Sequence, residues 1–154
     1  MKREVVILIA EDDEGQATLI QKNLARSGIT NEIIHFKDGQ ETLDFLFQRG
    51  NERTRQTGAS YILLLDIRMP KVTGMEVLRQ LKQDGELRKL PVIIFTTTDD
   101  PVEVDRCHKI GCNNYISKPV DYDKFFEAIS QLGLFLAVVE GPKINGAHLR
   151  DERV

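Results

Sequence analysis

The sequence lacks features that several classes of protein require. Its longest apolar runs are far shorter than the roughly 18–20 residues that a membrane-spanning helix needs. Lys and Arg number 21 against 24 Asp and Glu, a formal charge of −3, so no basic excess is available to grip a nucleic-acid backbone. A short apolar stretch near the N-terminus soon reaches acidic residues and is too brief for a secretory signal. We therefore expect a cytoplasmic protein with no membrane contact and no direct nucleic-acid contact.

Cysteine and histidine are equally sparse. Cys107 and Cys112 are the two cysteines, and their spacing matches no metal-binding motif. Neither follows a predicted strand with a paired histidine, and His35, His108 and His148 are scattered along the chain. The sequence predicts two reduced thiols and gives no indication of a serine or cysteine hydrolase.

Apolar runs alternate with helical patterns along most of the 154 residues. The first, third and fourth runs are almost continuously apolar, as expected of strands buried on both faces, and the second and fifth suit sheet edges. Strands alternating with helices indicate βαβ units and a parallel sheet. The predicted strands are 5–10, 31–36, 61–65, 92–96 and 114–117, and the predicted helices are 13–27, 38–49, 73–83, 101–111 and 121–139. The fold class is therefore a single doubly wound α/β domain.

Local sequence marks several boundaries of these elements. Thr73 with Glu76 reads as a capping box, and Asp38 and Asp100 are predicted N-caps. Gly28 and Gly111 follow the first and fourth helices, where a left-handed residue is common. The polar stretch 49–58 is expected to be an exposed loop. The segment 140–154 has no periodicity, and we expect an extended or loosely packed tail after a domain spanning 1–139.

Charged and hydroxyl residues follow the predicted strands at the points where ligands bind in open parallel sheets. Three or four carboxylates converging there would repel strongly, by about 4 kcal/mol for two charges about 4 Å apart at an effective dielectric of about 20. A divalent cation relieves that repulsion, and an all-oxygen site suits Mg²⁺. Each acid taken alone reads equally well as a solvated strand end, and Asp13 as an N-cap. The residues at these strand ends are Glu11, Asp12, Asp13, Asp66, Thr96 and Lys118.

Two other families with related chemistry fit less well. A flavodoxin-like flavin binder needs a phosphate loop rich in small and hydroxyl residues after the first strand, and here that loop is acidic. A haloacid-dehalogenase phosphatase needs a second Asp two residues after its nucleophile, and this chain has Arg68 there. No dinucleotide or P-loop glycine motif is present either.

The ordered set of these residues resembles the receiver domain of response regulators over roughly residues 5–139. The matching residues occur in that family's order and at its spacing. They are Glu11-Asp12, then Asp66 followed by Met69-Pro70 and Gly74, then Thr96, and last Lys118-Pro119. The resemblance implies a (βα)5 flavodoxin-like fold with strand order 2-1-3-4-5.

The same resemblance implies roles for individual residues. Asp66 is expected to be the phosphoryl acceptor, with Lys118 as the phosphate-contacting ammonium. Mg²⁺ is expected to be held by Glu11, Asp12, Asp66 and the backbone carbonyl of Arg68. Thr96 and Tyr115 are expected to form a switch that responds to phosphorylation. The implied protein is a phosphoacceptor that catalyses only its own phosphoryl transfer and dephosphorylation, and its implied partner is a sensor histidine kinase.

Arg68 leaves two interpretations open. Its side chain could pair with Asp13 or Glu14 and cover the acidic pocket, which would favour a dimeric binding module that works without phosphorylation. It could instead lie in solvent and only tune dephosphorylation.

The predicted fifth helix is apolar over more of its surface than packing on one sheet requires. The excess apolar residues could pack beneath the tail or form an intersubunit surface, and a two-fold homodimer through helix four, strand five and helix five is our expectation. With too few residues left for a separate output domain, signalling is expected to proceed through protein contacts. These features resemble the response regulators that partner bacterial phytochromes. The predicted dimer residues are Phe125, Leu132, Phe135 and Val139.

Overall fold

The protein is described by a computed structural model over residues 5–49, 53–98, 100–118, 127, 130, 131, 143 and 144. Five strands form a parallel sheet in the order β2-β1-β3-β4-β5, which confirms the predicted fold class. The strands are β1 (Val6–Ala10), β2 (Ile33–Phe36), β3 (Ala59–Leu65), β4 (Val92–Thr96) and β5 (Asn114–Ser117). The order places the two shorter, more polar strands at the edges, as their sequences indicated.

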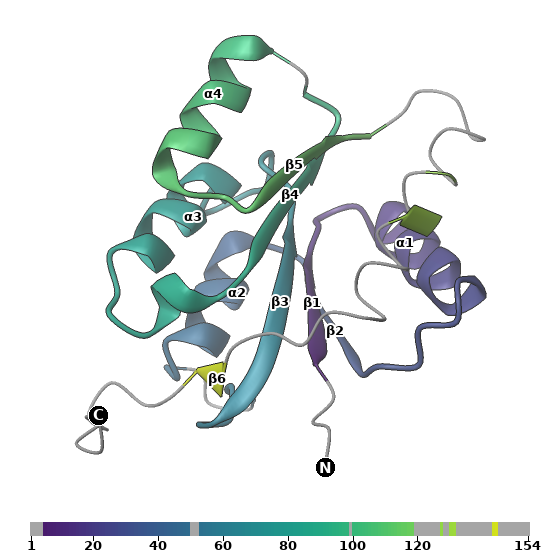
Figure 1. The fold of residues 1–154 in the computed structure, drawn as a ribbon, viewed down its shortest axis with the longest axis horizontal. Coiled ribbons are helices and arrows are strands. Elements are labelled where there is room, and N and C mark those ends of the chain that lie inside the picture. The colour runs from purple at the N-terminus through teal and green to yellow at the C-terminus, as the bar shows by residue number, and fades with distance from the viewer. Residues whose placement is uncertain are drawn as a thin grey trace.

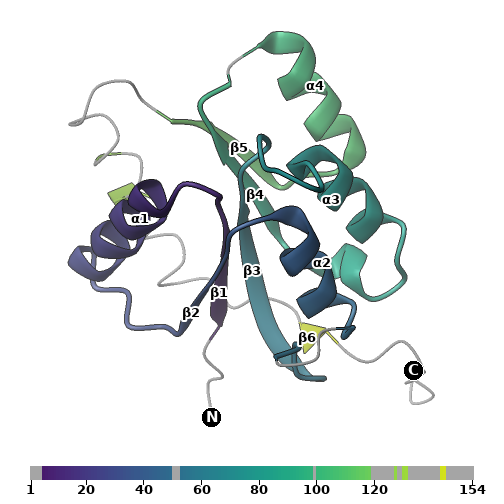
Figure 2. The same ribbon diagram turned by 180° about the vertical axis from the view of Figure 1, so that it is seen from behind.

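Helices cover both faces of the sheet (Figures 1 and 2). Helix α1 lies on one face, while α2, α3 and α4 lie on the other. None of the helices in the described part of the chain has the length and apolar content to cross a membrane. The helices are α1 (Glu14–Arg26), α2 (Gly39–Leu46), α3 (Gly74–Lys82) and α4 (Pro101–Ile110), with a 3-10 turn, η1, at Leu87–Lys89.

The continuous apolar runs bury side chains on both faces because successive strand residues point in opposite directions. In β3, Ile62 and Leu64 pack with Ile20 and Leu24 of α1 in one core cluster. Leu63, between them, joins the other cluster, which lies against α2, α3 and α4. One strand thus supplies both cores, and this fixes its register against slippage.

The predicted helix caps are present. Asp38 accepts from the Glu41 backbone N–H at 2.8 Å, and Thr73 accepts from that of Glu76 at 3.3 Å. Asp100 caps α4 by accepting from the Val102 N–H at 3.0 Å. The glycines after α1 and α4, Gly28 and Gly111, have positive φ angles of 93° and 125°, the conformation that favours glycine at helix ends.

The prediction that 49–58 is an exposed loop is wrong at Arg55, which is 5% exposed. Its Nε donates to the carbonyl of Leu46 at 2.7 Å and its guanidinium donates to the carbonyl of Ile144 at 3.1 Å. A buried guanidinium is tolerated when its donors are satisfied, and here backbone carbonyls far apart in sequence satisfy them.

Residues 143 and 144 of the predicted tail are extended, as one of the two predicted forms requires, but they are not loosely packed. Lys143–Ile144 forms a short strand, β6, that pairs antiparallel with the start of β3. Ile144 is fully buried in the larger core cluster, and its carbonyl accepts from Gly58 as well as Arg55. An isolated buried isoleucine in a polar segment has no periodicity, so the sequence pattern did not reveal it.

The helix predicted over 121–139 lies almost entirely outside the described residues; of its members, 127, 130 and 131 are described, and they are helical. The predicted dimer residues Phe125, Leu132, Phe135 and Val139 also lie outside the described residues.

Gly74 is the residue where the first turn of α3 touches the carboxyl end of β3. A Cβ at this position would lie 2.0 Å from the carbonyl oxygen of Asp66, a backbone atom that cannot turn aside as the end of a flexible side chain can. We expect Gly74→Ala to lower the free energy of unfolding by about 3 kcal/mol, the upper range for overpacking. Urea denaturation measures this change. Gly85→Ala is the control, because no atom lies within 4 Å of its Cβ position; equal effects of the two substitutions would refute the steric explanation.

The burial of Ile144 makes strand β6 part of the larger core cluster. We expect Ile144→Ala to cost about 2–5 kcal/mol of stability, the range for truncating a buried isoleucine. Val102→Ala provides a matched truncation of a side chain that is 65% exposed, and it should be nearly neutral. Thermal unfolding of the two variants would contradict the docked β6 if their midpoints agreed.

Candidate functional site

The carboxyl ends of four neighbouring strands bring the predicted site residues together. The register pairs Ala10 of β1 with Leu65 of β3, so Glu11 and Asp66 leave the sheet side by side. The backbone N–H of Asp66 donates to the Ala10 carbonyl at 3.0 Å and holds this end rigid. Glu11, Asp12 and Asp66 each present an atom that could ligate a metal, and these atoms lie within 4.8 Å of one another.

Lys118 is the cation of this cluster. It follows β5, and its Nζ donates to the carboxylate of Glu11 and lies 3.6 Å from Oδ2 of Asp66. The same ammonium lies 5.7 Å from the centre of the Phe95 ring. Lys118 and Asp66 are each 8% exposed and Glu11 is 2% exposed, so water screens these charges poorly. Three carboxylates face one ammonium, and the patch remains electronegative.

Glu11 responds most strongly to this environment. Burial raises the pKa of Glu11 from 4.5 to about 7, since it penalises the charged carboxylate; the hydrogen bond from Lys118 opposes the rise, and the charge of Asp66 adds to it. A buried carboxylate near its titration point at neutral pH is stabilised in its charged form by a further positive charge nearby. A divalent cation among the same oxygens would supply that charge, so the donor set fits Mg²⁺ or a similar hard ion.

Thr96, predicted as the switch hydroxyl, is the last residue of β4 and is fully buried. Among the described residues its Oγ1 has no hydrogen-bond partner, which is unusual for a buried hydroxyl. Tyr115, the predicted aromatic member of the switch, lies on the neighbouring strand β5 and is half-buried. Its hydroxyl donates to the backbone carbonyl of Thr98 at 2.7 Å.

Arg68 does not cover the acidic pocket through Asp13 or Glu14, as one interpretation of the sequence required. It is exposed, and its Nε donates to the hydroxyl of Thr98 at 3.1 Å. Within the described residues it makes no ion pair with either acid. Asp13 instead caps α1 by accepting from the Gln16 N–H at 3.0 Å, the structural role that the sequence allowed. The role of the Arg68 backbone carbonyl as a metal ligand stays a prediction.

Two residues near the site were not identified from sequence. His35, one of the three scattered histidines, lies on β2 and forms a 2.7 Å hydrogen bond from Nε2 to the carbonyl of Glu11; because a carbonyl only accepts, Nε2 carries the proton. Thr98 contacts both Arg68 and Tyr115. The position of Thr98 shortly after a predicted strand end could have marked it as a residue near the site. Nothing in the sequence indicated that Arg68 and Tyr115 would be its partners.

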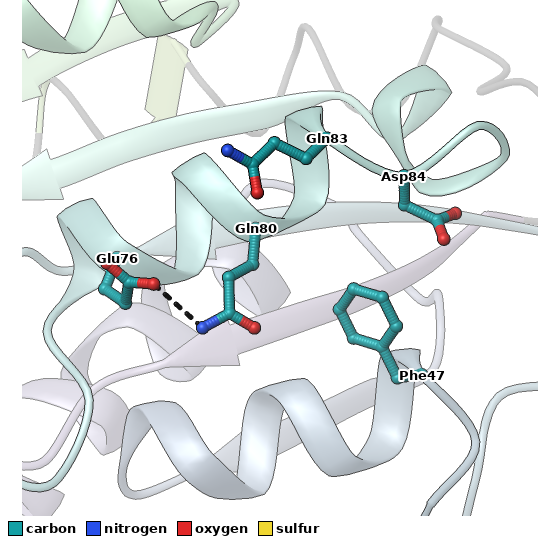
Figure 3. Close-up of a pocket in the computed structure, with 5 residues that line it drawn as sticks. All are labelled: Phe47, Glu76, Gln80, Gln83 and Asp84. Carbon is teal, nitrogen blue, oxygen red and sulfur yellow. Dashed lines mark hydrogen bonds between the residues drawn. The ribbon is translucent and has the colours of Figure 1, made fainter.

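A separate hollow of about 430 Å³ lies between the end of α2 and α3 (Figure 3). Its lining residues are Phe47, Glu76, Gln80, Gln83 and Asp84. Gln80 is tied to Glu76 by a 2.9 Å hydrogen bond, and Asp84 accepts from the backbone N–H groups of Glu86 and Leu87 at 3.0 and 2.8 Å. Most polar side chains of this lining already have partners, so the hollow offers less chemistry than the strand ends.

Known proteins have a similar fold and a similar sequence. The family model described as response regulator receiver domain matches residues 7–130. The crystal structure of a response regulator receiver domain from Rhodospirillum rubrum is 45% identical, with a TM-score of 0.85, and the match covers 92% of this chain and all of that one.

Two further structures of named response regulators are similar. The Mn²⁺-bound form of response regulator Rcp1 is 30% identical, with a TM-score of 0.80 over 90% of this chain and 99% of that one; the Synechocystis sp. Rcp1 sequence is 31% identical over 84% and 87% of the two chains. The bacteriophytochrome response regulator RtBRR is 38% identical, with a TM-score of 0.71 over 90% and 84%. With the family model matching most of its length, the chain belongs to the response regulator receiver domain family.

Proposed function

We propose that this protein is a response regulator that accepts a phosphoryl group on Asp66 from the phosphohistidine of a sensor histidine kinase in the cytoplasm. The observation that carries this proposal is the position of Asp66. Its carboxylate leaves a rigid strand end beside Glu11 and Asp12, and Lys118 lies 3.6 Å away. A carboxylate is a recognised nucleophile for phosphoryl transfer.

The transfer requires alignment and charge neutralisation more than covalent assistance. An oxygen of Asp66 forms the new bond to phosphorus while the bond from phosphorus to the histidine nitrogen breaks. The electron pair of the broken bond returns to the imidazole, which takes up a proton. Lys118 is positioned to stabilise the charge on the transferred group, and its bond to Glu11 holds the ammonium in place. The buried Thr96 hydroxyl, which has no partner in the part of the chain that the structure describes, is a donor available to a phosphoryl oxygen.

Mg²⁺ is the proposed cofactor, held by Glu11, Asp12, Asp66 and the backbone carbonyl of Arg68. When bound it neutralises the acids and polarises the phosphoryl group. Support comes from the clustered carboxylate atoms and from the relative Rcp1, which has a structure in its Mn²⁺-bound form.

The partner we propose is a bacteriophytochrome kinase, acting on a homodimer of this chain. Similarity to RtBRR, and to a cyanobacterial phytochrome response regulator at 28% identity and a TM-score of 0.78, supports this choice. The proposed interface comprises α4, β5 and the dimer contacts predicted from sequence, Phe125, Leu132, Phe135 and Val139.

Asp66→Asn tests the acceptor directly. The change is nearly isosteric and removes the nucleophile, so we expect complete loss of a phosphoryl adduct with the fold retained. Intact mass after incubation with a small-molecule phosphodonor, with and without Mg²⁺, measures the adduct, and circular dichroism checks the fold. Asp105→Asn, which removes an exposed acid of α4 paired with Lys109, should be phosphorylated like the wild type. An undiminished adduct on the Asp66→Asn protein would rule out Asp66.

The raised pKa of Glu11 gives the metal-free protein a characteristic dependence on pH. The folded pKa, about 7, lies above the unfolded value of 4.5, so the contribution of Glu11 to stability is full below about pH 4.5 and is lost as pH rises through 7. The loss is of the order of 3 kcal/mol. We expect wild type to lose this stability relative to Glu11→Gln, which carries no titrating group there.

Denaturant unfolding between pH 4.5 and 8, in EDTA and in Mg²⁺, measures the difference. Because the ion binds the deprotonated carboxylate, Mg²⁺ should restore wild-type stability at high pH and bind more weakly below pH 7. A wild type that parallels Glu11→Gln at every pH in EDTA would contradict the assignment.

A further inference from the structure

Thr98, two residues beyond the end of β4, is held from two sides. The Nε of Arg68 donates to its side-chain hydroxyl at 3.1 Å, and the hydroxyl of Tyr115 donates to its backbone carbonyl at 2.7 Å. Arg68 stands two residues after Asp66 in the loop between β3 and α3, and Tyr115 stands in the edge strand β5. A single residue therefore connects the loop of the phosphoryl acceptor with an aromatic side chain at the sheet edge.

The two bonds differ in how easily they break. The Tyr115 ring is half-buried, packs against the larger core cluster and lies 6.4 Å from the ring of His108. Packing limits the ring, and the bond to Thr98 fixes where its hydroxyl points. Arg68 is exposed, so its bond to the neutral Thr98 hydroxyl competes with water and with any nearby anion.

We propose, on the basis of the function proposed above, that Arg68 is a positioning residue that holds Thr98, and through it Tyr115, until a phosphoryl group forms on Asp66. A phosphoryl group adds a charge of about −1.5 to −2 and three strong acceptors. A guanidinium pairs with phosphate through two parallel hydrogen bonds, a stronger arrangement than one bond to a hydroxyl. The phosphoryl group draws Arg68 away, Thr98 loses its side-chain anchor, and Tyr115 loses its fixed acceptor.

The chain has three tyrosines, so the signal of Tyr115 can be resolved by fluorine NMR. Protein labelled with 3-fluorotyrosine gives one fluorine resonance for each tyrosine, and Tyr115→Phe assigns the resonance of interest. Arg68→Met removes the donor while keeping side-chain length, and Thr98→Val removes the hydroxyl while keeping shape. Arg68→Lys and Thr98→Ser retain the donor and the hydroxyl, and Arg79→Met removes an exposed arginine of α3 distant in sequence from the loop.

We expect Arg68→Met and Thr98→Val, without phosphodonor, to shift the Tyr115 resonance toward its position in phosphodonor-treated wild type. Thr98→Ser and Arg79→Met should leave it at the wild-type position, and Arg68→Lys should restore it at least in part. Circular dichroism confirms that each variant is folded. If neither Arg68→Met nor Thr98→Val moves the resonance, Arg68 does not position Tyr115 and the proposal is overturned.

Intact mass on the same samples separates this proposal from the proposed function. An adduct on Asp66 with an unmoved wild-type Tyr115 resonance overturns the release step and leaves the acceptor role standing. If the resonance moves in the two variants, the positioning of Tyr115 by Arg68 is supported. If the wild type at the same time carries no adduct, the acceptor role of Asp66 and the release step are overturned.

Discussion

The ammonium of Lys118 between Glu11 and Asp66 is the interaction on which the site depends. It joins the end of β5 to the ends of β1 and β3, so charge connects β5 to two strands from which β4 separates it in the sheet. Without a cation there, two buried carboxylates would face each other at low effective dielectric. Among the described residues one ammonium faces this group of acids, and burial, with the charge of Asp66 adding to it, still raises the pKa of Glu11. The same imbalance makes the site receptive to a divalent ion.

A charge cluster of this kind needs a rigid support, and the two core clusters provide it. Alternate residues of β1 and β3 enter opposite cores, so neither strand can slide by one residue without moving apolar side chains to the wrong face. The close approach of Gly74 to the Asp66 carbonyl then sets the first turn of α3 directly against Asp66, the proposed acceptor. Stability is concentrated in the sheet, while Arg68 and Thr98 lie in loops above it. Loops of this kind are where a local change of charge can produce motion.

The far end of β3 is tied down by different means. Arg55 and β6 bring together the end of α2, the start of β3 and residues near the end of the chain. Ordering these segments lowers conformational freedom, and the buried isoleucine at position 144 offsets that cost with apolar burial. The sheet is thus supported at its amino end by packing and at its carboxyl end by electrostatics.

The sequence by itself determined the strand and helix order, the edge strands, the helix caps and the residues that follow each strand, because hydrophobic periodicity and capping chemistry are local properties. It also identified Glu11, Asp12, Asp66, Thr96 and Lys118, since parallel strands place their carboxyl ends at one edge. Only the tertiary structure decided the burial of Arg55 and Ile144, whose partners lie up to 89 positions away. It also decided that Arg68 binds Thr98 rather than a neighbouring acid. A long flexible side chain has many reachable partners, and its choice among them depends on which loops the fold brings within a few ångströms.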